Sequence, residues 1–235
     1  MLDVASINSY YDTSHVLHDV SLSVEEGSLV TLIGRNGAGK TTTLNSIMGF
    51  VEPRSGSITF QGEDITGLAP NEVAQRGIAI IPEHRELFPQ LTVRENLRLG
   101  HLGHDLDGDP EDRIARVFEY FPRLEERQNQ RAGSLSGGER QMAAIGRSLV
   151  SDPSFLLIDE PTEGLMPTLV EKLRDILVQI NEEDGITMLL VEQNVSLALE
   201  ISDYAYVLDE GSIQSHGPSE EIAGDEEIKR KYLAV

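Results

Sequence analysis

A stretch near the N-terminus has the residue types and the spacing of a phosphate-binding turn. Gly34 to Thr41 fit the pattern G-x-x-x-x-G-K-[ST] at every fixed position, and glycines there let backbone N–H groups approach phosphate oxygens closely. Lys40 is expected to reach the β- and γ-phosphates of a nucleotide, and the Thr41 hydroxyl to hold Mg²⁺. The alternative is an ordinary glycine-rich turn. The residues predicted to bind the nucleotide phosphates are Gly34, Asn36, Gly37, Ala38, Gly39, Lys40, Thr41 and Thr42.

A second candidate for chemistry is an acidic pair that ends an apolar run. Asp159 and Glu160 directly follow residues 154–158, and the carboxyl ends of strands in open α/β sheets face the ligand crevice. Asp159 is therefore expected to hold Mg²⁺ opposite Thr41. Glu160 is expected to polarise a water molecule for attack on the γ-phosphate. Acids often end a strand by chance, so this prediction depends on the pair occurring together with the glycine-rich stretch.

A third motif lies between the first two. In the stretch 135–139, Ser136 can cap a helix that begins near Gly138, and Gly137 and Gly138 leave their N–H groups accessible. This arrangement favours a second anion-binding helix terminus. The alternative is a flexible helix cap without a ligand.

Along the chain the glycine-rich stretch comes first, the 135–139 stretch second and the acidic pair last, with a helical segment after the first. This arrangement resembles the ATP-binding subunit of an ABC transporter over essentially the whole chain. The resemblance implies a Mg²⁺-dependent ATPase that converts ATP and water to ADP and phosphate. It also implies a head-to-tail dimer, with a sister chain or with itself, in which Ser136, Gly137 and Gly138 contact ATP held by the other subunit. Tyr11 lies 29 residues before Lys40, where the family has an aromatic residue that stacks on adenine, and Tyr10 is the alternative.

Finer features resemble one branch of that family. Residues 81–97, 144–147 and 191–194 are similar to the second ATPase subunit of branched-chain amino acid importers, or of the similar urea and amide importers. The resemblance implies integral membrane permease subunits as partners, and indirectly an extracellular solute-binding protein. It places the chain in the cytoplasm, peripheral on the inner face of the cell membrane. A soluble ABC ATPase without a membrane channel is the other alternative.

Three positions differ from the general family pattern. Glu83 replaces a glutamine that touches Mg²⁺ and water, and a carboxylate can also serve there. Gln193 replaces the histidine that contacts the γ-phosphate; it can donate a hydrogen bond but does not titrate. Met166 replaces an aspartate. The first two recur in the branch named above, so Glu160, Gln193 and Glu83 are the predicted catalytic residues, and Thr41, Glu83 and Asp159 the predicted metal ligands. A nucleotide-sensing module without turnover remains an alternative.

The elements that position these residues indicate an α/β fold of the P-loop NTPase class, with a mostly parallel sheet and helices on both faces. Apolar runs predict buried strands at 28–33, 77–81, 154–158, 186–191 and 204–208. Alternating patterns at 4–7, 20–24 and 57–60 predict an added antiparallel layer. Helices are expected at 41–48, at 93–99 after a Thr92 cap, from Pro110 after an Asp109 cap, and at 167–183.

The domain organisation follows from these elements. The chain is predicted to be a single ABC ATPase domain spanning 1–235, in which 1–82 and 141–235 form the nucleotide-binding core with its β layer. Residues 83–140 are predicted to form an inserted helical subdomain that carries the Leu135–Glu139 motif. The segment 83–90 joins the two parts, so we expect it to transmit changes at the nucleotide to that subdomain.

Composition limits the partners and the compartment. The chain has no cysteine, which excludes disulfides and thiolate metal sites. No run approaches the roughly 18 apolar residues that span a bilayer, and the N-terminus lacks the pattern of a secretory signal. The 40 acidic residues against 19 Lys and Arg give a net charge of −21. Such a surface disfavours nucleic acid, which requires clustered cations.

The charge excess predicts that stability depends on salt. Self-repulsion on this scale destabilises a compact state, and at about 1 M salt the Debye length falls to about 3 Å and removes most of the penalty. We therefore expect a protein from a salt-rich cytosol, as in a salt-accumulating halophile; a merely acidic protein is the alternative. Thermal unfolding should move to higher temperature as KCl rises from about 0.1 M to about 2 M, because the added salt screens the repulsion. Equal stability at both ends would contradict the high-salt hypothesis.

Overall fold

Six strands form the central sheet, in the order β10-β9-β3-β8-β7-β6. The structure is a computed structural model that describes residues 1–84, 87–103 and 108–233. All neighbouring strands run parallel except β10, which is antiparallel to β9. β3, β7 and β8 are buried along their whole length, as expected for a parallel sheet covered on both faces. The strands are β3 Leu29–Ile33, β6 Ile78–Ile81, β7 Phe155–Asp159, β8 Thr187–Glu192, β9 Tyr204–Asp209 and β10 Ser212–Pro218.

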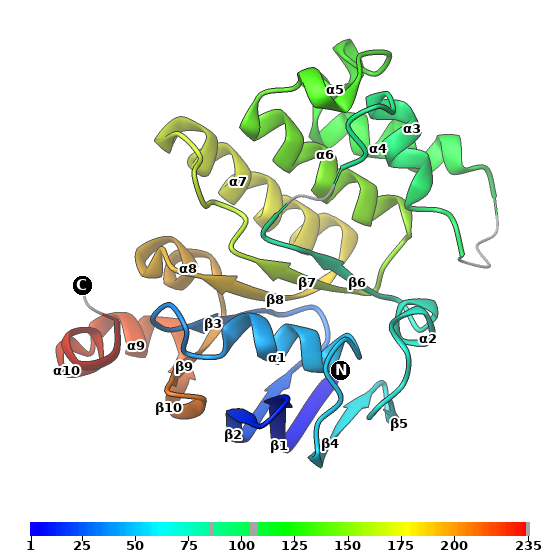
Figure 1. The fold of residues 1–235 in the computed structure, drawn as a ribbon. Helices are drawn as coiled ribbons and strands as arrows, with labels where there is room; N and C mark the ends of the chain where they lie inside the picture. The colour runs from blue at the N-terminus through cyan, green and yellow to red at the C-terminus, as the bar shows by residue number, and fades with distance from the viewer. Residues whose placement is uncertain (85–86, 104–107, 234–235) are drawn as a thin grey trace.

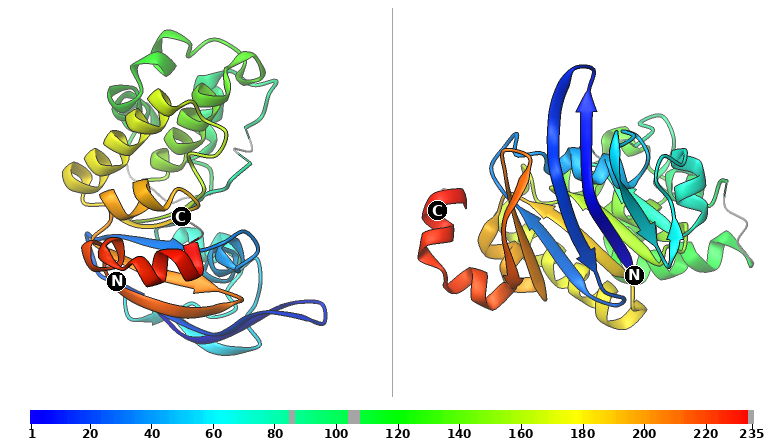
Figure 2. Two further views of the ribbon diagram at one scale, coloured as in Figure 1. Left: turned by 90° about the vertical axis from the view of Figure 1, so that its left-hand side faces the viewer. Right: turned by 90° about the horizontal axis from the view of Figure 1, so that it is seen from below.

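A second sheet is antiparallel, in the order β2-β1-β4-β5. Its strands are β1 Leu2–Tyr11, β2 Ser14–Val24, β4 Ser55–Phe60 and β5 Glu63–Asp64. The helix α1 (Lys40–Ile47) lies between the two sheets (Figure 1), and its Leu44 and Ile47 belong to one apolar cluster with Phe60 and Leu157. The hairpin of β1 and β2 projects beyond the rest of the molecule (Figure 2).

Helices cover the other face of the central sheet. A second apolar cluster joins Leu156 and Ile158 of β7 to the helices of the upper part of the molecule in Figure 1. These helices are α3 Val93–Leu99, α4 Pro110–Tyr120, α5 Pro122–Glu126, the 3₁₀ turn η1 Ala132–Ser134, α6 Gly137–Val150 and α7 Pro167–Asp184. The remaining helices are α2 Pro70–Gln75, α8 Val195–Ile201, α9 Ser219–Gly224, α10 Glu226–Ile228 and the π-helical turn η2 Lys229–Leu233.

The predicted caps are confirmed. The Thr92 side chain accepts from the Glu95 N–H at the start of α3, and Asp109 accepts from Glu111 at the start of α4. Ser136 accepts from the Glu139 N–H at the start of α6. In each case a short polar side chain satisfies an N–H that the helix leaves unpaired.

The predicted α/β architecture is also confirmed, with differences at the edges of elements. The antiparallel layer has a fourth strand, β5, and its hairpin strands are longer than the predicted runs, because register shifts along β1 and β2 interrupt the alternation that the prediction used. The predicted boundary at residue 140 falls inside α6. That helix begins at the Ser-Gly-Gly motif and continues to Val150, whose side chain packs in the second cluster.

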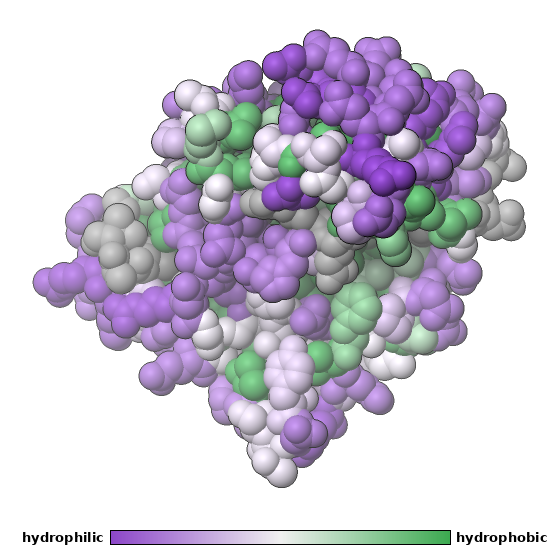
Figure 3. Space-filling model, turned by 45° about the horizontal axis from the view of Figure 1, so that its top comes forward, coloured by the Kyte–Doolittle hydropathy of each residue, from purple (hydrophilic) through white to green (hydrophobic). Residues whose placement is uncertain are grey.

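The surface is largely hydrophilic over the helical part of the molecule (Figure 3). Among the described residues, five large apolar side chains are exposed: Tyr11, Phe50, Phe88, Leu102 and Met166. In the part of the chain that the structure describes, no helix combines the length and the hydropathy needed to cross a membrane.

Candidate active site

The glycine-rich stretch connects β3 to α1, as the motif requires. Gly39 occupies the position before the first helical residue with φ of 109°, a backbone conformation that residues with a Cβ rarely adopt. A Cβ on Gly34 would lie 2.1 Å from the Leu208 carbonyl oxygen, so the backbone of β9 leaves no room for a side chain there. The loop therefore presents its N–H groups at the N-terminus of α1, where the helix dipole favours an anion.

The ammonium group of Lys40 is buried and has three partners. It donates to the carbonyl oxygens of Gly34 at 3.0 Å and Arg35 at 3.2 Å, and it lies 3.3 Å from Glu160 Oε1. Lys40 is 4% exposed and Glu160 is 8% exposed. On its other side, the Glu160 carboxylate accepts a hydrogen bond from Gln193 Nε2. Glu160 is thus held between a cation and an amide at the mouth of the glycine-rich stretch 34–41, which we call the phosphate loop.

Asp159, the last residue of β7, is 3% exposed and approaches α1. Burial raises the pKa of Asp159 to about 6, and the Glu160 and Glu83 charges add to this rise, whereas a hydrogen bond from the Thr41 side chain opposes it. Within the described part of the chain, its Oδ1 is buried without a hydrogen-bond partner. A cation beside Asp159 and Thr41 would satisfy that oxygen and offset the burial of its charge. The residues therefore fit a Mg²⁺ ion.

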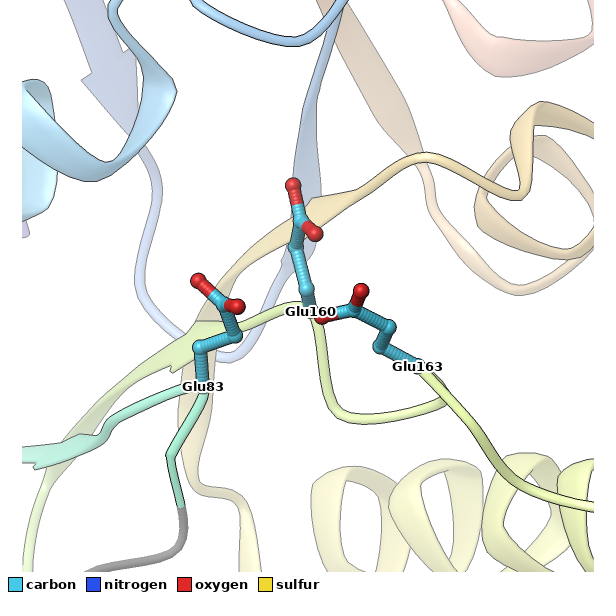
Figure 4. A group of neighbouring side chains, drawn as sticks. All are labelled: Glu83, Glu160 and Glu163. Atoms are coloured by element: carbon cyan, nitrogen blue, oxygen red, sulfur yellow. The ribbon is translucent and has the colours of Figure 1, made fainter.

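Glu160 is also one of three carboxylates that gather beside this point. Glu83, Glu160 and Glu163 each offer an oxygen within 4.8 Å of the others (Figure 4). Burial raises the pKa of Glu83, and a hydrogen bond with Glu163 raises it further. Like charges at this distance repel, so the cluster favours a bound cation or a shared proton. Sequence reasoning missed Glu163; its place on the loop after an acidic strand end was the available signal.

A cavity of about 410 Å³ brings most of the predicted residues together. Val16 of β2 also lines it, although no sequence motif points to this residue. The predicted residues that line the cavity are Asn36, Gly37, Gly39, Lys40, Thr41, Thr42, Glu83, Glu160 and Gln193.

Other predicted residues lie outside that cavity. Tyr11 is 47% exposed at the end of β1. Its neighbour Tyr10 stacks on the His15 ring with 4.1 Å between the ring centroids, and the Arg54 guanidinium lies over the Tyr10 ring. Ser136, Gly137 and Gly138 belong to the start of α6. Among the described residues, neither tyrosine and no residue of the Ser-Gly-Gly motif lines the phosphate-loop cavity, so their contacts with a nucleotide stay predictions.

Comparison with known proteins identifies the family of this chain. Residues 17–163 match the family described as ABC transporter. The chain belongs to this family. The predicted identity as an ABC transporter ATP-binding subunit is therefore confirmed.

Relatives match along the full length of the chain. It is 44% identical over 233 residues to the high-affinity branched-chain amino acid transport ATP-binding protein BraG of Pseudomonas aeruginosa, covering 99% of each protein. It is 37% identical over 235 residues to the probable branched-chain amino acid transport ATP-binding protein LivF of Archaeoglobus fulgidus, covering 100% of this chain and 99% of that protein. It is 36% identical over 234 residues to the lipopolysaccharide export system ATP-binding protein LptB of Escherichia coli, covering 99% of this chain and 96% of that protein.

Solved structures agree with the fold. A nucleotide-free ATP-binding cassette from an ABC transporter superposes with a TM-score of 0.87 at 26% identity, covering 100% of this chain and 98% of that one. The dimeric post-hydrolysis cassette MJ0796 bound to ADP and Pi gives 0.83 at 26% identity, covering 93% and 99%. None of these likenesses bears on salt, so the high-salt hypothesis stays a prediction.

Because Asp159 is buried, its ionised carboxylate is expected to lower the stability of the folded protein. Because its pKa is raised from 3.8 to about 6, the native carboxylate is disfavoured above pH 6, and this cost disappears as pH falls through the range between the two values. Asp159→Asn should therefore stabilise the protein by roughly 1–3 kcal/mol above pH 6 without nucleotide or divalent cation, and should weaken Mg²⁺-dependent nucleotide binding.

Thermal unfolding at several pH values and titration with Mg²⁺ nucleotide measure both effects. Asp3→Asn is the matched control, since Asp3 is an exposed acid on β1 and undergoes the same chemical change. A lower melting temperature for Asp159→Asn than for the parent protein above pH 6 would show that the buried carboxylate does not destabilise the fold.

Proposed function

We propose that this chain is the ATP-hydrolysing subunit of an ABC importer for branched-chain amino acids. As an ABC ATPase it binds ATP and hydrolyses it to ADP and phosphate. One observation supports Glu160 as the base for hydrolysis: its carboxylate lies between Lys40 and Gln193 at the mouth of the phosphate loop. The cargo is supported by the full-length similarity to BraG and LivF.

The mechanism follows from these contacts. Lys40 now neutralises Glu160, and a γ-phosphate in the cavity competes for the same ammonium group. When Lys40 turns to the phosphate, Glu160 loses its counter-charge and becomes a better acceptor for a proton of the attacking water. Gln193 holds the carboxylate in place by its amide hydrogen bond. Thr41, Asp159 and Glu83 would hold Mg²⁺, which neutralises charge on the phosphates when bound.

The partners follow from the family. ABC cassettes form dimers, as in the MJ0796 structure bound to ADP and Pi, and we propose a head-to-tail dimer with a sister chain or a second copy. Ser136, Gly137 and Gly138 of one subunit then contact the γ-phosphate held by the other, and Tyr11 stacks on adenine. Permease subunits position the dimer on the inner face of the membrane, and an extracellular solute-binding protein delivers the cargo to them.

Mutation of the proposed base tests the chemistry. Glu160→Gln keeps the shape and the Gln193 contact but removes the proton acceptor, so ATP hydrolysis should fall by at least about 100-fold while ATP binding remains. Lys40→Ala provides the contrast, because it should weaken nucleotide binding itself. Steady-state phosphate release and equilibrium ATP binding measure the two. Undiminished turnover by Glu160→Gln would place the base elsewhere.

Reconstitution tests the cargo. The chain, a partner ATPase subunit or second copy, and permease subunits should show ATPase activity in vesicles that rises several-fold with a solute-binding protein loaded with leucine, isoleucine or valine. Urea and short amides are the competing cargoes. Stimulation by those alone would transfer the assignment to a urea or amide importer, and failure to co-purify with any membrane protein would favour a soluble ABC ATPase.

A further inference from the structure

Glu192, the last residue of β8, is a buried carboxylate to which no role has been assigned so far. It is 2% exposed and accepts four hydrogen bonds. Its Oε1 accepts from the Thr162 backbone N–H at 3.1 Å and from the Thr162 hydroxyl at 2.6 Å. Its Oε2 accepts from the backbone N–H groups of Gln193 at 3.0 Å and Asn194 at 3.1 Å.

These hydrogen bonds connect the two loops that meet at Glu160. Thr162 lies two residues after Glu160 on the loop that leaves β7. Gln193 and Asn194 form the loop between β8 and α8, and the Gln193 side chain donates to Glu160. Residues 160, 162, 192 and 193 therefore form a closed ring. The Glu192 side chain bonds both loops, and the Gln193 side chain closes the ring at Glu160.

The chemistry of the ring requires a carboxylate at position 192. All of its partners in the ring are donors, and an ionised carboxyl group only accepts. A glutamine would direct its NH₂ group toward at least one backbone N–H in either orientation. Burial raises the pKa of Glu192, and the hydrogen bonds from Thr162, Asn194 and Gln193 oppose that rise. A buried charge is weak evidence for stability, so a role in function is the better explanation.

We propose that Glu192 is a positioning residue for ATP hydrolysis, which fixes the loop of Gln193 against the loop of Thr162 so that the Gln193 amide orients the Glu160 carboxylate. This inference rests on the proposed role of Glu160 as the base. The backbone bond from Glu160 N to Val191 O, at 2.9 Å, aligns the two strand ends but does not reach the side chains. Glu192 instead fixes the backbone of Gln193, whose side chain reaches the Glu160 carboxylate.

The test compares three variants of the chain assembled with its partner ATPase subunit. Glu192→Gln should lower kcat by about 10- to 100-fold, by analogy with partners that orient the ligands of metal sites. ATP binding should change by no more than about twofold, since no phosphate-loop contact is lost. Thr162→Val should lower kcat less, because only the hydroxyl bond is removed. Thr162→Ser, which retains the hydroxyl, should restore it.

Thr31→Val is the matched control. Thr31 is fully buried in β3, and its hydroxyl donates to the Leu190 carbonyl oxygen of β8 at 3.1 Å. The variant loses a buried hydrogen bond to the same strand as Glu192 but touches neither loop. It should lose thermal stability and keep kcat. An equal loss of kcat in Thr31→Val would show that general destabilisation explains Glu192→Gln, and would overturn the proposal.

Two further measurements locate the effect. Hydrogen exchange in the segments 159–165 and 192–197 should accelerate together in Glu192→Gln and in neither segment in Thr31→Val. In a Gln193→Ala background, Glu192→Gln should cost no more than about threefold in kcat, because coupled residues are non-additive. A full effect in that background, or wild-type kcat in Glu192→Gln, would overturn the inference while Glu160→Gln still abolishes hydrolysis. If Glu160→Gln hydrolyses ATP normally, the proposed base and this inference both fail.

Discussion

A buried ammonium group facing a buried carboxylate, Lys40 against Glu160, is the interaction on which the rest of the site depends. Two such charges are costly to remove from water, and their attraction compensates only when the geometry is good and other hydrogen bonds are made. The Gly34 and Arg35 carbonyl oxygens and the Gln193 amide supply those bonds. The order β3-β8-β7 in the central sheet is what brings the three contributing loops to one edge.

The same edge concentrates negative charge. Asp159, Glu83 and Glu163 lie near Glu160, and burial or mutual repulsion raises the pKa of Asp159 and of Glu83. A fold selected for stability alone would avoid this grouping, because like charges repel one another. The grouping is understandable in a site that handles a cation and a polyphosphate. The residues that perform the chemistry therefore reduce the stability of this edge of the sheet.

Much of the fold and of the core of the site could be predicted from the sequence, because the decisive signals are local. The phosphate loop, the acids that end β7 and the serine that caps α6 are each contained in fewer than ten consecutive residues. What could not be predicted depends on contacts between residues that are far apart in the sequence. Glu192 becomes informative only when Thr162 is known to lie beside it, 30 residues away in sequence, and Val16 only when β2 is known to pass the phosphate loop. The stretch 191–194 resembles one branch of the family but does not indicate the contacts of Glu192, and Val16 lies in none of the motifs.

The side chains of β7 alternate between two apolar cores. Phe155 and Leu157 pack with α1 and the antiparallel sheet, whereas Leu156 and Ile158 pack with the helical part of the molecule. The helical part is therefore not an autonomous module that could be excised or exchanged between relatives as a unit. Its removal would expose one whole face of the strand that ends in Asp159, and a graft would need to match that face as well as its own interior.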